Sequence, residues 1–130
     1  MKMTIVPDIE KAGSLVEMAQ ITLERLQETN QKKYPTNTLT DYYDSIHKLL
    51  EALSYIQGVK IKGEGAHQEL INYICKNYNL GEAQRVFLQE LRDYRNRISY
   101  EGFKIGPLFL ENNLQKIEEI IIILKKLIKK

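Results

Sequence analysis

The chain lacks the sequence features that mark secreted and membrane-spanning proteins. It has a single cysteine, Cys75, so no disulfide can form within the chain. Residues 1–7 have no long apolar core of the kind found in signal peptides. The longest apolar run, residues 120–124, is far too short to span a bilayer. These absences predict a cytoplasmic protein without a membrane segment, in which Cys75 is a buried thiol; a reactive thiol is the alternative.

Histidine is also scarce, and neither sign of charge predominates. The two histidines, His47 and His67, and the single cysteine do not have the spacing of a metal site, so we expect no metal and no cofactor. The net charge is only +2, so any affinity for nucleic acid must come from local clusters of basic residues. His67 falls in the first turn of an expected helix, which disfavours its protonated form. Packing explains both histidines more simply than catalysis does.

Length and periodicity predict the fold. A chain of 130 residues indicates one domain, residues 1–130, that is large enough to bury a core without disulfides. Apolar residues recur at helical spacing in five segments, and none alternates as a strand does. The expected helices cover residues 7–30, 38–58, 66–77, 79–100 and 107–130. Their short connections predict an all-α, five-helix up-and-down bundle.

Local signals set the expected helix boundaries. Pro35 is expected to stop the first helix, and Thr38 begins a capping-box pattern for the second. Gly58 suits a left-handed cap at the end of that second helix. Residues 59–65, with two glycines, are expected to form a mobile loop. Asn79 begins a second capping-box pattern, which is expected to open the fourth helix.

The fifth helix is apolar nearly all round. A helix of this kind must be buried on several sides, and in so small a domain a second subunit can cover the excess. A two-fold homodimer is therefore expected, because this is the commonest oligomer geometry. A membrane-surface helix is the alternative, but Glu118 and Glu119 argue against binding to anionic lipid.

The most chemically loaded stretch lies near the end of the fourth helix. Residues 92–102 hold three arginines, one asparagine, one serine and two tyrosines. On a helical projection the core face consists of Phe87, Leu91, Tyr94 and Ile98, and the far side of Arg85, Arg92, Asn96 and Ser99. Arg95 falls between the two faces, where a half-buried guanidinium can present its fork to a phosphate or carboxylate. The plain alternative is that these arginines are merely solvated.

The order of residues in this stretch resembles the signature helix of HEPN domains. Arg95-Asn96, three further residues and then Tyr100 match a motif of arginine, often followed by asparagine, and then four to six residues and a histidine. Tyr100 occupies the histidine position. The resemblance extends more loosely back to Tyr42, through residues 67–71, and covers about half of the chain. HEPN domains are small all-helical modules of prokaryotic toxin–antitoxin and defence systems.

The resemblance implies a HEPN-type bundle that forms a homodimer. Active members cut RNA without metal, using the arginine and histidine of two motif helices, and many are encoded beside a small nucleotidyltransferase antitoxin. Tyrosine is a poor base at neutral pH because its ordinary pKa is about 10. We therefore expect binding of RNA, nucleotide or a partner protein without efficient catalysis. The expected binding residues are Arg92, Arg95, Asn96, Ser99 and Tyr100.

Two alternatives stay open. One is a metal-independent endoribonuclease toxin in which Arg95 works with Tyr100, His47 or His67. The other is a structural interaction domain whose arginines pair with carboxylates across a subunit contact. Nucleic-acid affinity is expected to depend on the arginines at positions 92, 95 and 97, and the lysines at positions 60 and 62 are the second candidates.

Overall fold

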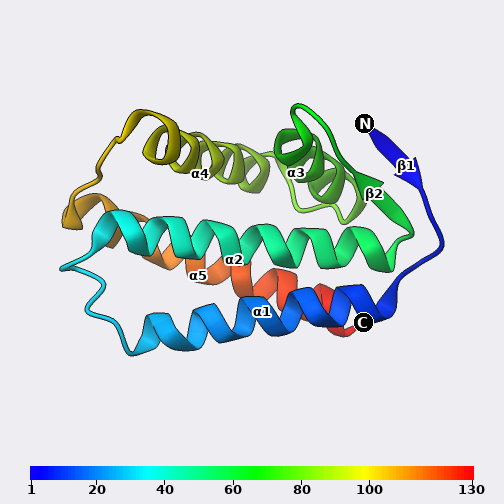
Figure 1. Ribbon diagram of the computed structural model, residues 1–130, viewed down its shortest axis with the longest axis horizontal. Coiled ribbons are helices and arrows are strands. Elements are labelled where there is room, and N and C mark those ends of the chain that lie inside the picture. The colour runs from blue at the N-terminus through cyan, green and yellow to red at the C-terminus, as the bar shows by residue number, and fades with distance from the viewer.

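The computed structural model describes residues 1–130 and confirms an all-α five-helix bundle (Figure 1). The helices are α1 (Ile9–Gln27), α2 (Pro35–Ile56), α3 (Ala66–Asn77), α4 (Glu82–Glu101) and α5 (Pro107–Lys129). Two short strands, β1 (Lys2–Thr4) and β2 (Val59–Ile61), complete the fold. None of the helices combines the length and the apolarity needed to cross a membrane.

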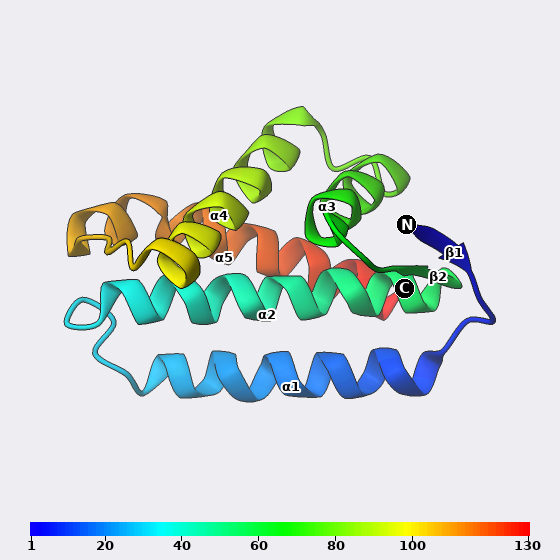
Figure 2. The same cartoon turned by 45° about the horizontal axis from the view of Figure 1, so that its top comes forward.

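Helix α2 lies at the centre of the bundle and packs against the four other helices. In both overall views α1 runs along one side of α2, whereas α3 and α4 lie across the opposite side (Figures 1 and 2). Helices α3 and α4 also pack against each other. The carboxyl-terminal half of α4 and the amino-terminal end of α3 are thus both held above α2.

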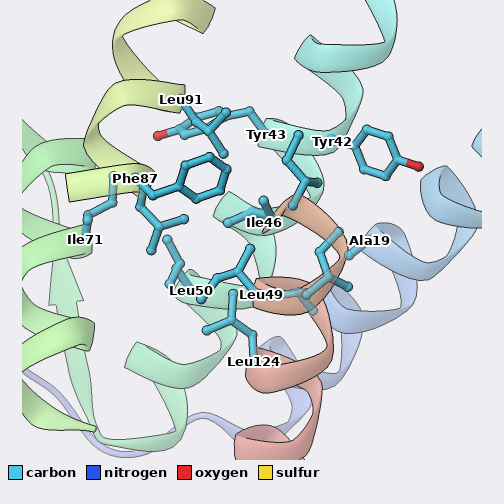
Figure 3. Packing of buried hydrophobic residues seen from close by; sticks show 14 of the residues in the cluster. Ala19, Tyr42, Tyr43, Ile46, Leu49, Leu50, Ile71, Phe87, Leu91 and Leu124 are labelled. Atoms are coloured by element: carbon cyan, nitrogen blue, oxygen red, sulfur yellow. The ribbon is translucent and has the colours of Figure 1, made fainter. Parts of the chain in front are cut away.

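The core is built around the apolar face of α2. Leu49 and Leu50 have no exposed surface, and they belong to one cluster of 23 buried residues. Figure 3 shows their side chains gathered in one interior with those of Ile71 from α3, Phe87 from α4 and Leu124 from α5. Burial of this apolar area is the main force that holds the helices together.

Three of the predicted boundary signals were wrong, and two of them concern the start of α2. Pro35 does not stop the first helix, which already ends at Gln27; it is the first residue of α2. This position suits proline because its fixed φ fits the first helical turn, where its missing N–H is not needed. Thr38 is therefore not a cap but lies inside α2, buried, and its hydroxyl donates to the carbonyl of Gln31 over 3.5 Å.

The third wrong signal concerns the cap of α4, and α1 begins later than the predicted residue 7. Pro7 precedes α1, whose N-cap is Asp8; the Asp8 carboxylate accepts a hydrogen bond from the Lys11 N–H at 2.9 Å. Asn79 does not cap α4; it adopts a φ of 55° just after α3. Asparagine tolerates this left-handed conformation better than most residues do. The N-cap of α4 is Gly81, without a side-chain hydrogen bond.

The segment predicted to be a mobile loop is partly a strand. Val59–Ile61 pairs antiparallel with Lys2–Thr4, and Thr4 lies opposite Val59 in the register. Three-residue strands are too short to show the alternation on which a strand prediction depends. The pairing fixes the chain just before the glycine-rich turn that leads into α3.

Substitution of Gly58 is predicted to destabilise the fold more than substitution of Gly13, the glycine inside α1. Its φ is +74°, as expected for a left-handed cap, and an added Cβ would lie 2.8 Å from the carbonyl oxygen of Ile5. We expect Gly58→Ala to lower the free energy of unfolding by about 1–3 kcal/mol, measured by urea denaturation. Gly13, inside α1 with nothing within 4 Å, is the matched control. Gly13→Ala should raise stability by about 0.5–1 kcal/mol; equal effects of the two variants would contradict the close approach.

Candidate functional site

The packing of α4 places its polar residues against the start of α3. Phe87 and Leu91 are buried in the core, and Tyr94 and Ile98 pack against it, so the predicted core face is confirmed. The adjoining face of α4 lines a pocket of about 370 Å³, which we call the α3–α4 pocket. Its walls are Gly63, Gly65, Ala66, His67, Gln68, Arg92, Arg95, Asn96 and Tyr100.

Arg95 is half-buried and oriented, as its position beside the core stripe predicted. Its Nε donates to Oδ1 of Asp44 on α2 at 3.2 Å, and its side chain is 26% exposed. The Nε of Arg92 donates to Gln89 over 2.7 Å. The terminal nitrogens of both arginines have no hydrogen-bond partner within the chain. Both guanidinium groups are thus held at one edge and free to bind an anion at the other.

The amino terminus of α3 adds backbone donors to the pocket. Its N-cap is Gly65, which adopts a φ of 74°. Because glycine has no side chain, this residue cannot cap the helix with a side-chain hydrogen bond. The backbone N–H groups of His67 and Gln68 have no partner within the chain. Unpaired N–H groups and the positive end of the helix dipole favour a negative charge at this place. No carboxylate lines the pocket to compete with such a ligand.

The structure brings together two histidines that are far apart in the sequence. The rings of His47 and His67 stack with their centroids 3.8 Å apart. The Nδ1 of His47 lies 3.1 Å from Glu51, and the Nδ1 of His67 lies 3.5 Å from the hydroxyl of Tyr43. We call these four residues the histidine cluster. Together with Lys60, the two histidines and Glu51 line a second pocket of about 120 Å³, and His67 lines both pockets.

The environment of the cluster favours a neutral His67. Burial lowers its pKa, and the electrostatic effects of the neighbouring His47 and Arg95 lower it further, whereas Glu51 and Asp44 act in the opposite direction. This direction agrees with the sequence-based expectation of a neutral His67, and burial is its main cause. Burial raises the pKa of Glu51, but the hydrogen bond from His47 and nearby cations outweigh it and bring this pKa below its ordinary value. Burial also raises the pKa of Tyr43, which therefore keeps its proton.

We expect stability to fall on acidification. The pKa values of His67 and Glu51 are lower in the folded protein than in the unfolded chain. At a pH between the folded and the unfolded pKa of each group, the unfolded chain therefore binds more protons than the folded protein does. Their stabilising contributions are complete above the ordinary values, about 6.5 for histidine and about 4.3 for glutamate, and are lost as the pH falls through the folded values. Urea denaturation should show a lower free energy of unfolding at about pH 5 than at about pH 7. His67→Gln should flatten this dependence; an unchanged slope would rule out His67 as its source.

The remaining sequence candidates divide between the pocket and other surfaces. Asn96 and Tyr100 line the pocket, and Tyr100 is 82% exposed. Ser99 is exposed and does not line it. The guanidinium carbon of Arg97 instead lies 4.0 Å from the ring centre of Phe103, and Arg97 does not line the pocket. The pocket therefore gathers four of the five predicted binding residues.

Other basic and nucleophilic candidates lie apart from the α3–α4 pocket. Arg85 is paired with Glu82 and Asn72. Lys62 lines neither pocket that contains His67. The buried thiol predicted for Cys75 is confirmed, and burial raises its pKa to about 11. A thiol with this pKa remains protonated and unreactive near neutral pH.

Sequence reasoning missed the partners that orient these residues. Asp44 fixes Arg95, and Glu51 fixes His47, but neither carboxylate was singled out. The spacing of His47 and Glu51, four residues apart on one helix, was a usable signal, because such residues are neighbours on a helix surface. No signal of this kind links His67 to either arginine.

Comparison of the chain with protein-family models, with curated proteins and with solved structures yields no match. The function must therefore be inferred from the chemistry of the site.

Proposed function

We propose that the chain binds single-stranded RNA through the α3–α4 pocket, as a HEPN-like protein. One observation carries the proposal. The pocket is lined by Arg92 and Arg95, whose terminal nitrogens have no partner, and by His67 and Gln68, whose backbone N–H groups have none, and no carboxylate lines it. Phosphate oxygens are good acceptors for such donors, and a guanidinium binds phosphate through two parallel hydrogen bonds.

Tyr100 favours a nucleotide ligand over a simple anion. Its ring is largely exposed at the edge of the pocket, where a base can stack on it. The amides of Asn96 and Gln68 also line the pocket and can bond to a base edge or a ribose hydroxyl. The pocket has room for few phosphates, so we propose modest affinity with a shallow dependence on salt.

The proposal includes a homodimer. Helix α5 exposes Leu108 and Ile122, with 67% and 52% of their surface accessible, and the amphipathic pattern alone does not account for these side chains. A small nucleotidyltransferase antitoxin is the proposed protein partner, because the resemblance to HEPN domains implies such a partner. The alternative of a purely structural domain is less favoured, because Arg85 and Arg97 already pair with carboxylates of their own chain. Light scattering that gives a monomer mass at micromolar concentrations would exclude the homodimer.

The proposal is tested by fluorescence anisotropy with a labelled single-stranded RNA in EDTA. We expect Arg95→Ala to weaken binding about tenfold, since a charge-assisted hydrogen bond is worth about 1.5–3 kcal/mol and Arg95 is only half-buried. Arg85→Ala is the matched control, because Arg85 lies on the same helix outside the pocket, and should bind as wild type does. Binding that survives the loss of both Arg92 and Arg95 would refute the pocket and point to Lys60 and Lys62.

A further inference from the structure

His67 stands between the α3–α4 pocket and the histidine cluster. It lines the pocket together with Arg92 and Arg95, and its ring stacks on that of His47. It is the only residue of the pocket wall whose type of side chain ordinarily changes its charge between about pH 5 and about pH 8. A pocket suited to an anion therefore contains one group whose charge depends on the pH of the solution.

We propose that binding of RNA in the α3–α4 pocket is coupled to protonation of His67, so that the chain binds RNA more tightly in mildly acidic than in neutral solution. The inference rests on the proposed function, because it requires phosphate groups of RNA to occupy the pocket. The free chain, with a neutral His67, takes up a proton from solution together with the RNA, and the imidazole of the complex carries this proton. No covalent bond of the RNA changes.

The hydroxyl of Tyr43 lies close to all three groups that this coupling involves. It is 3.5 Å from Nδ1 of His67. Burial raises the pKa of Tyr43, and the positive charges of Arg92 and Arg95 act on the same hydroxyl and lower this pKa. The imidazole and the two guanidinium groups are therefore neighbours. A phosphate held by either arginine lies within electrostatic reach of His67.

In the free chain, the charge of Arg95 opposes protonation of His67. Burial is the main cause of the lowered pKa of His67, and Arg95 adds to it. A phosphate bound to Arg95 brings a negative charge, which offsets this repulsion and favours the protonated imidazole. By linkage, a ligand that raises the pKa of His67 must bind more tightly as the pH falls. This gain in affinity is complete below the pKa of the free chain and disappears above the pKa of the complex.

The other groups around His67 do not replace it as the source of this effect. The charged and titratable groups that face it are Tyr43, Asp44, His47 and Glu51 of α2, Arg92, Arg95 and Tyr100 of α4, and Lys60 of β2. Glu51 is paired with His47, and Asp44 with Arg95, so neither carboxylate is free to neutralise a new charge on His67. Lysine, arginine and tyrosine side chains titrate well above neutral pH. Only a second histidine, His47, ordinarily titrates in the same range.

His47 provides the matched control. Its ring centroid lies 3.8 Å from that of His67, but His47 does not line the α3–α4 pocket, and its Nδ1 is 3.1 Å from Glu51. His47→Gln and His67→Gln each remove one titrating imidazole, and only His67→Gln changes the pocket wall. The electrostatic effect of His47 lowers the pKa of His67. Its loss should therefore move the pH dependence of binding to higher pH without abolishing it.

The test measures fluorescence anisotropy of a labelled oligouridylate in EDTA at one fixed ionic strength. Uracil and phosphodiester groups do not titrate in mildly acidic or neutral solution, so a pH dependence of binding reports on the protein. We expect wild type to bind at least about fivefold more tightly at about pH 5.5 than at about pH 7.5, the lower end of the usual coupling between two sites. His67→Gln should abolish this difference, and His47→Gln should retain it. Circular dichroism at each pH verifies that the proteins are folded.

Calorimetry of wild type gives a second readout that needs no variant. The enthalpy of binding is measured in buffers with different enthalpies of ionisation, and the difference gives the number of protons taken up with the RNA. We expect uptake of a fraction of a proton at about pH 6.5, the ordinary pKa of histidine. Equal enthalpies in all buffers, or a pH dependence that persists in His67→Gln, would overturn the inference but leave the proposed function intact. Absence of RNA binding at every pH would instead refute the proposed function itself.

Discussion

Leu50→Ala is expected to lower the free energy of unfolding by about 2–5 kcal/mol. Leu50 lies on α2, has no exposed surface and belongs to the main core cluster. Its truncation removes apolar contacts and leaves a cavity, because helices packed on several sides cannot all move inward. A domain of this size is stable by about 5–15 kcal/mol, so the loss is a large share of the total. Urea denaturation followed by circular dichroism measures it.

The matched control for this variant is Ile21→Ala. Ile21 lies on α1 with 60% of its surface exposed and outside the α5 surface proposed for the homodimer, so its truncation should change stability by no more than about 0.5 kcal/mol. A similarly large loss in both variants would mean that the loss does not depend on burial in the core. A small loss in Leu50→Ala would contradict the central position of α2 in the core.

Tyr100→Ser is expected to weaken binding of single-stranded RNA by about 5- to 150-fold. This range corresponds to about 1–3 kcal/mol, the usual contribution of one base stacked on an aromatic ring. Tyr100→Phe keeps the ring and should bind within about twofold of wild type. Because Tyr100 is 82% exposed, neither substitution should alter the thermal midpoint appreciably. Anisotropy titrations at one fixed salt concentration compare the three proteins.

Further outcomes of the Tyr100 series distinguish its roles. If Phe and Ser weaken binding equally, the hydroxyl rather than the ring contacts the RNA, and stacking is excluded. Tyr100→His restores the histidine of the HEPN motif, and it should increase metal-independent cleavage that still requires Arg95. Unaltered binding in all three variants would place the base elsewhere on the surface.

The buried and exposed faces of individual helices were predictable, because they depend only on the periodicity of apolar residues within each helix. Phe87 and Leu91 were assigned to the core face of α4, and the same projection placed Arg95 half-buried at its edge. The ends of the helices were less predictable, because one residue type can either end a helix or begin one. Pro35 was expected to stop one helix but begins the next, and Asn79 was expected to cap α4 but adopts a left-handed conformation after α3.

The candidate site was predictable only along α4. Arg92, Arg95, Asn96 and Tyr100 lie one or two turns apart, so helical geometry alone brings them to one surface. His67 reaches them because α3 and α4 pack together above α2, a result of tertiary packing that no local pattern encodes. The sequence motif places a histidine only after Arg95, whereas His67 precedes it in the chain and is brought to the same pocket by α3.

The central position of α2 also has a consequence for folding during synthesis. Helices α1 and α2 leave the ribosome first and can pair at once as a helical hairpin, because their contacts are close in the sequence. The face of α2 that receives α5 stays uncovered until residues 107–129 have emerged. A nascent chain stalled before Pro107 thus exposes core leucines of α2. It should be a chaperone substrate, whereas the released chain, with α5 docked, should not.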